Sequence, residues 1–193
     1  MTGFELSLAV LALLLTPGPT NSLMLLAGAE RGLPRAVRLI PAEVAGYLLT
    51  VVPLTLIGQS VLQAWPGLAL AVALVAAVWV ALLAVRLWRV PTGEAQVSVG
   101  ARALFVTTAL NPKALIFGLV LLPSAERLAG NLALFTGLVV IVAVLWAGIG
   151  AGLRGAASLG QSGQPRALFV LRRLASVFLA AMSVLLVLRG VSA

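Results

Sequence analysis

The sequence predicts an all-α membrane protein in which six transmembrane helices form two inverted three-helix repeats. The first observation is the composition: of 193 residues, 62% are hydrophobic and only 9% are charged, too few polar side chains to cover a water-facing surface. The second is that the apolar residues fall into six runs, each about 20 residues long, which is the length that crosses a hydrocarbon core of about 30 Å. The third is a proline-containing break in the first and in the fourth run.

The residue types that the chain lacks exclude most enzyme classes. It has 0 His and 0 Cys, and the printed sequence contains no aspartate. Imidazole bases, thiolate nucleophiles and His/Cys metal clusters are therefore impossible. We expect no catalytic residue, no metal site and no cofactor, and we expect that the protein is not an enzyme.

Each apolar run is expected to form a helix, because an isolated strand in lipid leaves backbone groups unpaired and the runs lack the alternation of barrel strands. The six runs cover residues 4–27, 39–58, 65–87, 103–122, 132–153 and 168–188. The first run contains Glu5 and has no basic segment before it, so we expect it to stay in the mature protein. Tyr47, Trp79 and Trp146 lie inside runs and are predicted mainly to pack there.

The basic residues predict the orientation of the chain in the membrane. Ten of the 13 flank the first, third and fifth connections between the runs: Arg31, Arg35, Arg38, Arg86, Arg89, Arg102, Arg154, Arg166, Arg172 and Arg173. The positive-inside rule places these connections in the cytoplasm and both termini outside it, in a multi-pass membrane protein. Topology and lipid headgroups account for the net charge of +8, so we expect the lipid bilayer and no nucleic acid as a partner.

A polar connection with Pro91 and Gly93 divides the chain into two halves of three runs. We place repeat one at about residues 1–90, the linker at about 90–101 and repeat two at about 102–193, within a single transmembrane domain that covers residues 1–193. Because three is odd, the second half must lie upside down relative to the first, as in inverted-repeat transporters. Gly148 and Gly152 form a GxxxG motif that predicts close helix packing, and a homodimer stays open as the assembly.

The two breaks fall at corresponding positions, near the middle of the first run of each half. The first contains Thr16, Pro17, Gly18, Pro19, Thr20 and Asn21, and the second contains Asn111, Pro112 and Lys113. Proline lacks an N–H donor and clashes with the preceding turn, so each helix should be kinked or split there. Thr16 before Pro17 and Asn111 before Pro112 resemble an N-cap residue followed by proline, which predicts that a new helix begins at each break.

With this topology the two restarted helices run in opposite directions, so their N-termini should meet near the middle of the membrane. Each helix N-terminus carries roughly +0.5 charge and unpaired N–H groups, which favour an anion such as a carboxylate. In the alternative, the prolines only kink the helices and neighbouring Ser or Thr residues satisfy the freed carbonyls. The pairing of two such breaks with Lys113 favours a binding site.

Two charged side chains inside the runs are candidates for function. Lys113 lies roughly 15 Å from the end of its run at about 1.5 Å per residue, where a lone ammonium costs ~3 kcal/mol. It should therefore face a wet cavity or a partner, the alternative being a buried pair that only fastens helices together. Glu43 is the one carboxylate well inside a run. It either pairs with Arg35 or Arg38 near the membrane surface, or it binds a substrate ammonium or carries a coupling proton.

Two segments of the sequence carry a family resemblance: TPGPTNSLMLLAGAERGLPRAVR in the first run and its loop, and RALFVTTALNPKALIFGLVLLP in the fourth run. Through these segments, and through the order and spacing of the six runs over essentially the whole chain, the sequence resembles the LysE/RhtB family of amino-acid exporters. The resemblance implies efflux of amino acids or close derivatives from the bacterial cytoplasm, driven by the proton motive force. It also implies that the family's motifs match Pro17, Gly18, Pro19, Asn111, Pro112 and Lys113.

The hypothesis that follows is an exporter that works by alternating access. Lys113, Asn111 and the backbone near Gly18 and Thr20 would hold the carboxylate of an amino acid or derivative. Thr16 and Asn21 would add polar contacts, and Glu43 would take the ammonium group or the coupling proton.

Three alternatives stay open. An exporter of a metal ion or another small solute is disfavoured, because hard cations want several oxygen ligands and only Glu43 lies within the membrane. An intramembrane enzyme would need a Ser/Lys pair, made by Lys113 with Ser22 or Ser124. A non-transporting membrane subunit gives no reason for a lysine and paired helix breaks in mid-membrane.

Overall fold

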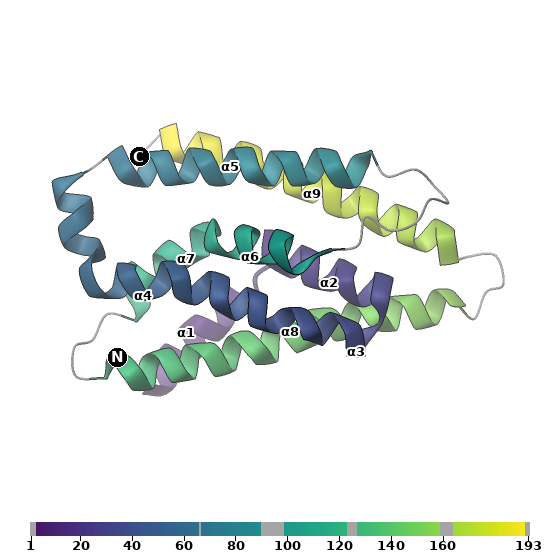
Figure 1. The fold of residues 1–193 in the computed structure, drawn as a ribbon, viewed down its shortest axis with the longest axis horizontal. Helices are drawn as coiled ribbons and strands as arrows, with labels where there is room; N and C mark the ends of the chain where they lie inside the picture. The colour runs from purple at the N-terminus through teal and green to yellow at the C-terminus, as the bar shows by residue number, and fades with distance from the viewer. Residues whose placement is uncertain (1–2, 66, 90–98, 123–126, 159–163, 192–193) are drawn as a thin grey trace.

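The computed structural model describes residues 3–65, 67–89, 99–122, 127–158 and 164–191, and every regular element in these ranges is a helix (Figure 1). The α-helices are α1 (Gly3–Leu15), α2 (Pro19–Arg31), α3 (Leu33–Ala36), α4 (Ile40–Ala64), α5 (Gly67–Trp88), α6 (Ala101–Ala109), α7 (Pro112–Ile116), α8 (Leu128–Ser158) and α9 (Gln164–Val191). A 3-10 turn, η1 (Val37–Leu39), precedes α4, and a π-helical turn, η2 (Phe117–Leu121), continues α7. The all-α prediction is confirmed for the described residues.

Two stretches are long and apolar enough to cross a membrane, Leu33–Gly58 and Leu128–Arg154. Two bent pairs pass the same test when each is taken as one span: α1 with α2, bent by 64°, and α6 with α7 and η2, bent by 46°. The structure is therefore that of a membrane protein with two clear spans, or up to four when the bent pairs are included. The third and sixth runs form α5, of 22 residues, and α9, of 28 residues. That all six runs cross the membrane stays a prediction.

The predicted breaks in the first and fourth runs are present, and proline begins the helix that follows each one. The second break has the predicted N-cap, because the Asn111 side chain accepts a hydrogen bond from the Lys113 backbone N–H at 3.0 Å. At the first break the predicted N-cap is wrong. Gly18, in an extended conformation, caps α2, whereas the Thr16 N–H and hydroxyl both bond back to the Ala12 carbonyl and so prolong the last turn of α1.

Helices α2 and α8 touch backbone to backbone at two glycines. A Cβ on Gly28 would lie 2.0 Å from the Ala147 carbonyl oxygen, and one on Gly150 would lie 1.9 Å from the Leu25 carbonyl oxygen. The prediction that Gly148 and Gly152 provide close packing is wrong for the described residues, since a Cβ at either position would have none of their atoms within 4 Å outside its own helix backbone. The reason is geometric: two residues along a helix turn the side chain by about 200°, so Gly150 faces α2 while its neighbours face away.

Helices α5 and α9 lie alongside each other (Figure 1) and are joined by two side-chain hydrogen bonds. Ser176 Oγ donates to the Ala84 carbonyl at 2.6 Å, and Ser183 Oγ donates to the Ala77 carbonyl at 2.9 Å. One hydrophobic cluster joins this pair to α2 and α8, and a second joins α1, α4, α7, η2 and α8. Below, α5 and α9 together are called the helix pair.

The ends of the helices alternate as the predicted topology requires. The beginning of α1 and the end of α9 lie at one end of the bundle, and the ends of α2, α5 and α8 lie at the other (Figure 1). The connections that the basic residues place in the cytoplasm begin at this second end.

Candidate functional site

The two helix breaks lie against each other, although they are far apart in the sequence. Asn111 Nδ2 donates to the hydroxyl of Thr20 at 2.9 Å and to the hydroxyl of Tyr47 at 3.3 Å. The Thr108 hydroxyl, at the end of α6, lies 3.3 Å from the same Thr20 oxygen. All four residues are buried. The start of α2 and the start of α7 are thus joined by a polar network inside an apolar bundle.

The helices that end at the breaks have their last carbonyls satisfied by side chains. The final carbonyls of a helix lack partners within it, and the membrane interior offers no water to replace them. At the end of α1, Asn21 Nδ2 donates to the carbonyls of Leu14, at 2.8 Å, and of Thr16, at 3.0 Å. At the end of α6, the Thr50 hydroxyl donates to the Ala109 carbonyl at 2.7 Å. These contacts hold both breaks in a defined geometry.

Lys113 reaches from the second break into the first. Its ammonium donates a hydrogen bond to the main-chain carbonyl of Thr16, and the residue is only 9% exposed. Gly18 leaves the room for it, because a Cβ there would lie 3.2 Å from Lys113 Nζ and 3.3 Å from Cε. The partner that the sequence required is therefore a carbonyl at the electronegative end of α1. Lys113 touches both sides of the first break.

Glu43 lies on α4 and is 2% exposed, and its Oε2 is buried without a hydrogen-bond partner. It lies one helical turn before Tyr47, whose hydroxyl meets Asn111 at the second break. The interpretation that it pairs with Arg35 or Arg38 is wrong, since Glu43 forms no ion pair within the described residues and both arginines are exposed. A carboxylate with an unpaired buried oxygen is costly, so a missing partner such as a proton or a cationic group would stabilise it.

The remaining predicted residues shape the breaks. Pro19 and Pro112 begin α2 and α7, and Pro17 lies in the link between α1 and α2. No described side chain caps the first turn of α2. Pro19 has no N–H and the Ser22 N–H bonds to the Gly18 carbonyl, so the N–H groups of Thr20 and Asn21 are the ones that could serve an anion. Thr16 and Pro17 are exposed, whereas the chain from Gly18 to Asn21 is buried. The first break therefore has one open edge.

The structure also bears on the enzyme and metal alternatives. Ser22 bonds to the Gly18 carbonyl at 3.0 Å, and the Lys113 amine is engaged by Thr16, so no Ser22–Lys113 hydrogen bond forms. Ser124 lies outside the described residues. Among the residues that the structure describes, no three side chains of His, Cys, Asp or Glu gather as a metal would require.

Sequence reasoning missed several members of this network. Thr50 and Thr108 were not singled out, and Tyr47 was assigned mainly to packing. The Tyr47 ring does pack, edge-on against Phe117 and Phe135 with centroids 5.9 and 5.5 Å away, but its hydroxyl also joins Asn111. The available signal was chemical, because a hydroxyl in an apolar run needs a partner, and a nearby helix break supplies free carbonyls.

Comparisons with known proteins give no relative: no protein-family model, no curated protein and no solved structure matches the chain. The likeness to the LysE/RhtB exporters therefore rests on the two sequence segments quoted above and on the order and spacing of the six apolar runs.

Proposed function

We propose that this protein is a secondary-active exporter of amino acids or close derivatives in the bacterial inner membrane, driven by the proton motive force and related to the LysE/RhtB family. One observation supports the proposal above the others. A buried lysine reaches from one broken helix into the other, a buried glutamate lies one turn before the Tyr47 that contacts the second break, and one glutamate oxygen has no partner among the described residues. Burying both charges is expensive, and a binding site repays that cost where a purely structural contact does not.

The pair of charges suits a zwitterion. An amino-acid carboxylate would replace the neutral Thr16 carbonyl as the acceptor for Lys113, which exchanges an ordinary hydrogen bond for a charge-assisted one. The uncapped first turn of α2 would add N–H donors for the same carboxylate. The ammonium group would lie toward Glu43. Asn111, Thr20 and Asn21 then act by holding the breaks in place, since their side chains already bond to each other or to carbonyls.

Glu43 is also the group that we assign to proton coupling. A bound ammonium group and a bound proton each satisfy the buried carboxylate, and the two exclude each other. Exchange of one for the other on opposite sides of the membrane couples substrate efflux to proton entry. The six-span topology, with both termini outside the cytoplasm, is part of this proposal.

The experiment is uptake of labelled amino acids into proteoliposomes with an acidic lumen, where proton efflux should drive substrate inward. Lys113→Met and Glu43→Gln remove one charge each with little change in size. We expect each to lower substrate flux by about 100-fold or more, as loss of an orienting contact does. Thr55→Val is the matched control, because the Thr55 hydroxyl bonds to the Val51 carbonyl of its own helix.

The outcomes separate the parts of the proposal. Wild-type flux in Lys113→Met would overturn the site. Flux in Glu43→Gln that still responds to the pH gradient would overturn the coupling role. An absence of flux for every amino acid tested with the wild-type protein would overturn the substrate class.

A further inference from the structure

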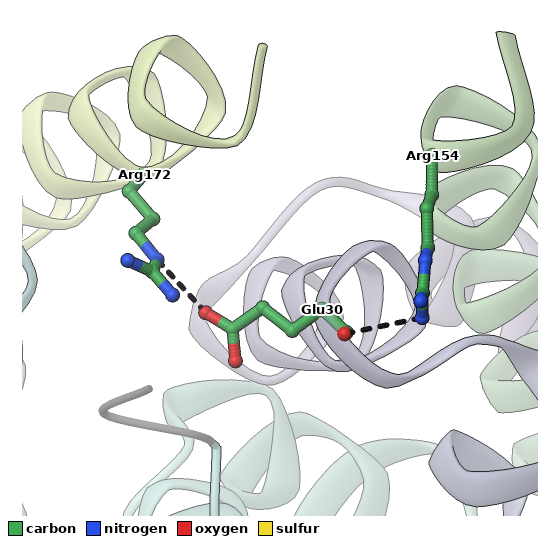
Figure 2. Close-up of polar contacts among 3 residues, drawn as sticks. All are labelled: Glu30, Arg154 and Arg172. Carbon is green, nitrogen blue, oxygen red and sulfur yellow. Dashed lines mark hydrogen bonds and ion pairs between the residues drawn. The ribbon is translucent and has the colours of Figure 1, made fainter. Parts of the chain in front are cut away.

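Glu30 is a buried acid far from the candidate site that the proposed mechanism does not use. It lies at the end of α2 and is 7% exposed. Its Oε1 accepts a hydrogen bond from Arg172 Nε of α9 at 2.9 Å, and Arg154 Nη1 of α8 donates to its backbone carbonyl at 3.2 Å (Figure 2). Two arginines from different helices therefore converge on one residue of α2.

The helix pair orients Arg172 toward α2. Arg173, the next residue, stacks its guanidinium over the rings of Trp88, at 3.8 Å, and Phe169, at 4.8 Å, so it binds within the pair. Successive helical residues point about 100° apart, and Arg172 accordingly reaches out of the pair. Its carboxylate partner belongs to the broken helix that carries the candidate site.

The described polar side-chain contacts between the helix pair and the other helices occur at two levels. Near the middle of α5, Trp79 Nε1 donates to the Thr107 hydroxyl of α6 at 2.9 Å. At the end of α2, Arg172 holds Glu30. The second contact lies at the end of the bundle that the basic residues place in the cytoplasm, and α2 connects it directly to the first break.

The ion pair between Arg172 and Glu30 is weaker than a fully satisfied arginine–carboxylate pair. Arg172 contacts the carboxylate through one nitrogen, whereas a strong arginine–carboxylate pair uses two parallel hydrogen bonds. The second oxygen, Oε2, is buried and has no partner among the residues that the structure describes, so the cost of removing the carboxylate from water is only partly repaid. A contact of this kind stabilises one conformation without making the other inaccessible.

We propose that the Glu30–Arg172 ion pair is a cytoplasmic latch, which holds the helix pair against α2 and opens to admit substrate to the site at the breaks. The role given to this opening, the admission of substrate, rests on the proposed function. Its opening can nevertheless be measured without any substrate, because the expected motion separates α9 from α2 at one end only.

Cysteine labelling tests this directly, since the chain has 0 Cys. Ala27→Cys places a thiol on α2, one turn before Glu30, at a position that is 0% exposed in the cluster shared with α5 and α9. A membrane-impermeant maleimide is applied to inside-out and to right-side-out vesicles. We expect Glu30→Gln and Arg172→Gln each to raise the labelling rate by about tenfold in inside-out vesicles only, with no further increase in the double variant.

Arg35→Gln is the matched control, because Arg35 is an exposed arginine at the same end, and its labelling rate should equal that of the Ala27→Cys parent. Unchanged labelling in both latch variants would overturn the proposal. So would an equal rise in the control, or a rise from both sides of the membrane, which indicates general loosening of the bundle.

Arg172→Lys keeps the charge and provides a second test if the glutamine variants do not fold; it should label at a rate between the parent and the open variants. A rate equal to that of the parent would contradict the need for the Arg172 nitrogen contact. Because labelling needs no substrate, a failed transport assay leaves this result valid, and failure of the latch leaves the transport assay valid.

Discussion

The ammonium of Lys113 donates to the main-chain carbonyl of Thr16, 97 residues earlier in the chain. That carbonyl directly follows the last residue of α1, and the end of the lysine side chain lies beside Gly18, the N-cap of α2. One side chain from the second break therefore touches both parts of the first. The position of the Lys113 side chain therefore depends on the bend between α1 and α2. In the proposed alternating-access mechanism, a substrate that binds Lys113 could change that bend.

Gly18→Ala should impair transport while leaving stability nearly unchanged. The new Cβ would lie 3.2 Å from Lys113 Nζ, so the flexible end of the lysine must move and the backbone need not. A displacement of about 1 Å at a binding group can lower a rate by about 100-fold. The Cβ requires a shift of only a few tenths of an ångström, so we expect a smaller loss of flux, of about three- to tenfold. Gly148→Ala, in open space, is the control. Wild-type flux in Gly18→Ala would contradict the placement of Lys113 in the site.

The bond between Asn111 and Thr20 should contribute measurable coupling energy. Asn111→Ala removes the N-cap of α7 and the bonds to Thr20 and Tyr47, so it should lower the free energy of unfolding by about 1–3 kcal/mol. Thr20→Val should cost about 1 kcal/mol. In SDS titrations of the purified protein, the double variant should fall short of additivity by about 0.5–1.5 kcal/mol. Additive effects would mean that the two breaks are not joined by this contact.

Contact between α2 and α8 should be sensitive to single methyl groups. Gly28→Ala and Gly150→Ala each push a Cβ into a carbonyl of the facing helix and should destabilise the protein by about 1–3 kcal/mol. Gly148→Ala should change stability by less than about 0.5 kcal/mol. Thermal unfolding followed by size-exclusion chromatography compares the three. If Gly148→Ala lowers stability more than the other two variants, then Gly148 and not Gly150 lies on the face of α8 that packs against α2.

The hydrogen bond from Trp79 to Thr107 should respond unequally to loss of donor and acceptor. The Thr107 hydroxyl also donates to the Ala103 carbonyl at 2.6 Å, so Thr107→Val leaves the indole N–H without its partner and should cost about 1–3 kcal/mol. Adding Trp79→Phe removes that unpaired donor. In the same SDS titration, the double variant should lose about 1 kcal/mol less unfolding free energy than the two single variants lose together. Strict additivity would show that the indole finds another partner.

Much of the local structure could be predicted from the sequence. The apolar runs became helices because backbone groups in lipid must bond internally, and a new helix begins after each break because proline lacks an N–H. The second begins at Pro112 as predicted, whereas the first begins at Pro19 and not at the predicted Pro17. The cap at Asn111 followed from the same local chemistry. Thr16 did not become a cap because its N–H and hydroxyl both reach Ala12, and only the structure shows that α1 continues that far.

Composition, helix breaks and the alternation of helix ends were determined by the sequence itself, because they depend on residues near each other in the chain. Tertiary structure alone decided the partners: Lys113 with Thr16, Glu30 with Arg172, and Gly150 instead of Gly148 against α2. The physical reason is that helices in lipid are apolar on most faces, so the sequence carries little information on how each turns about its axis. That rotation, set by packing, selects which side chains meet.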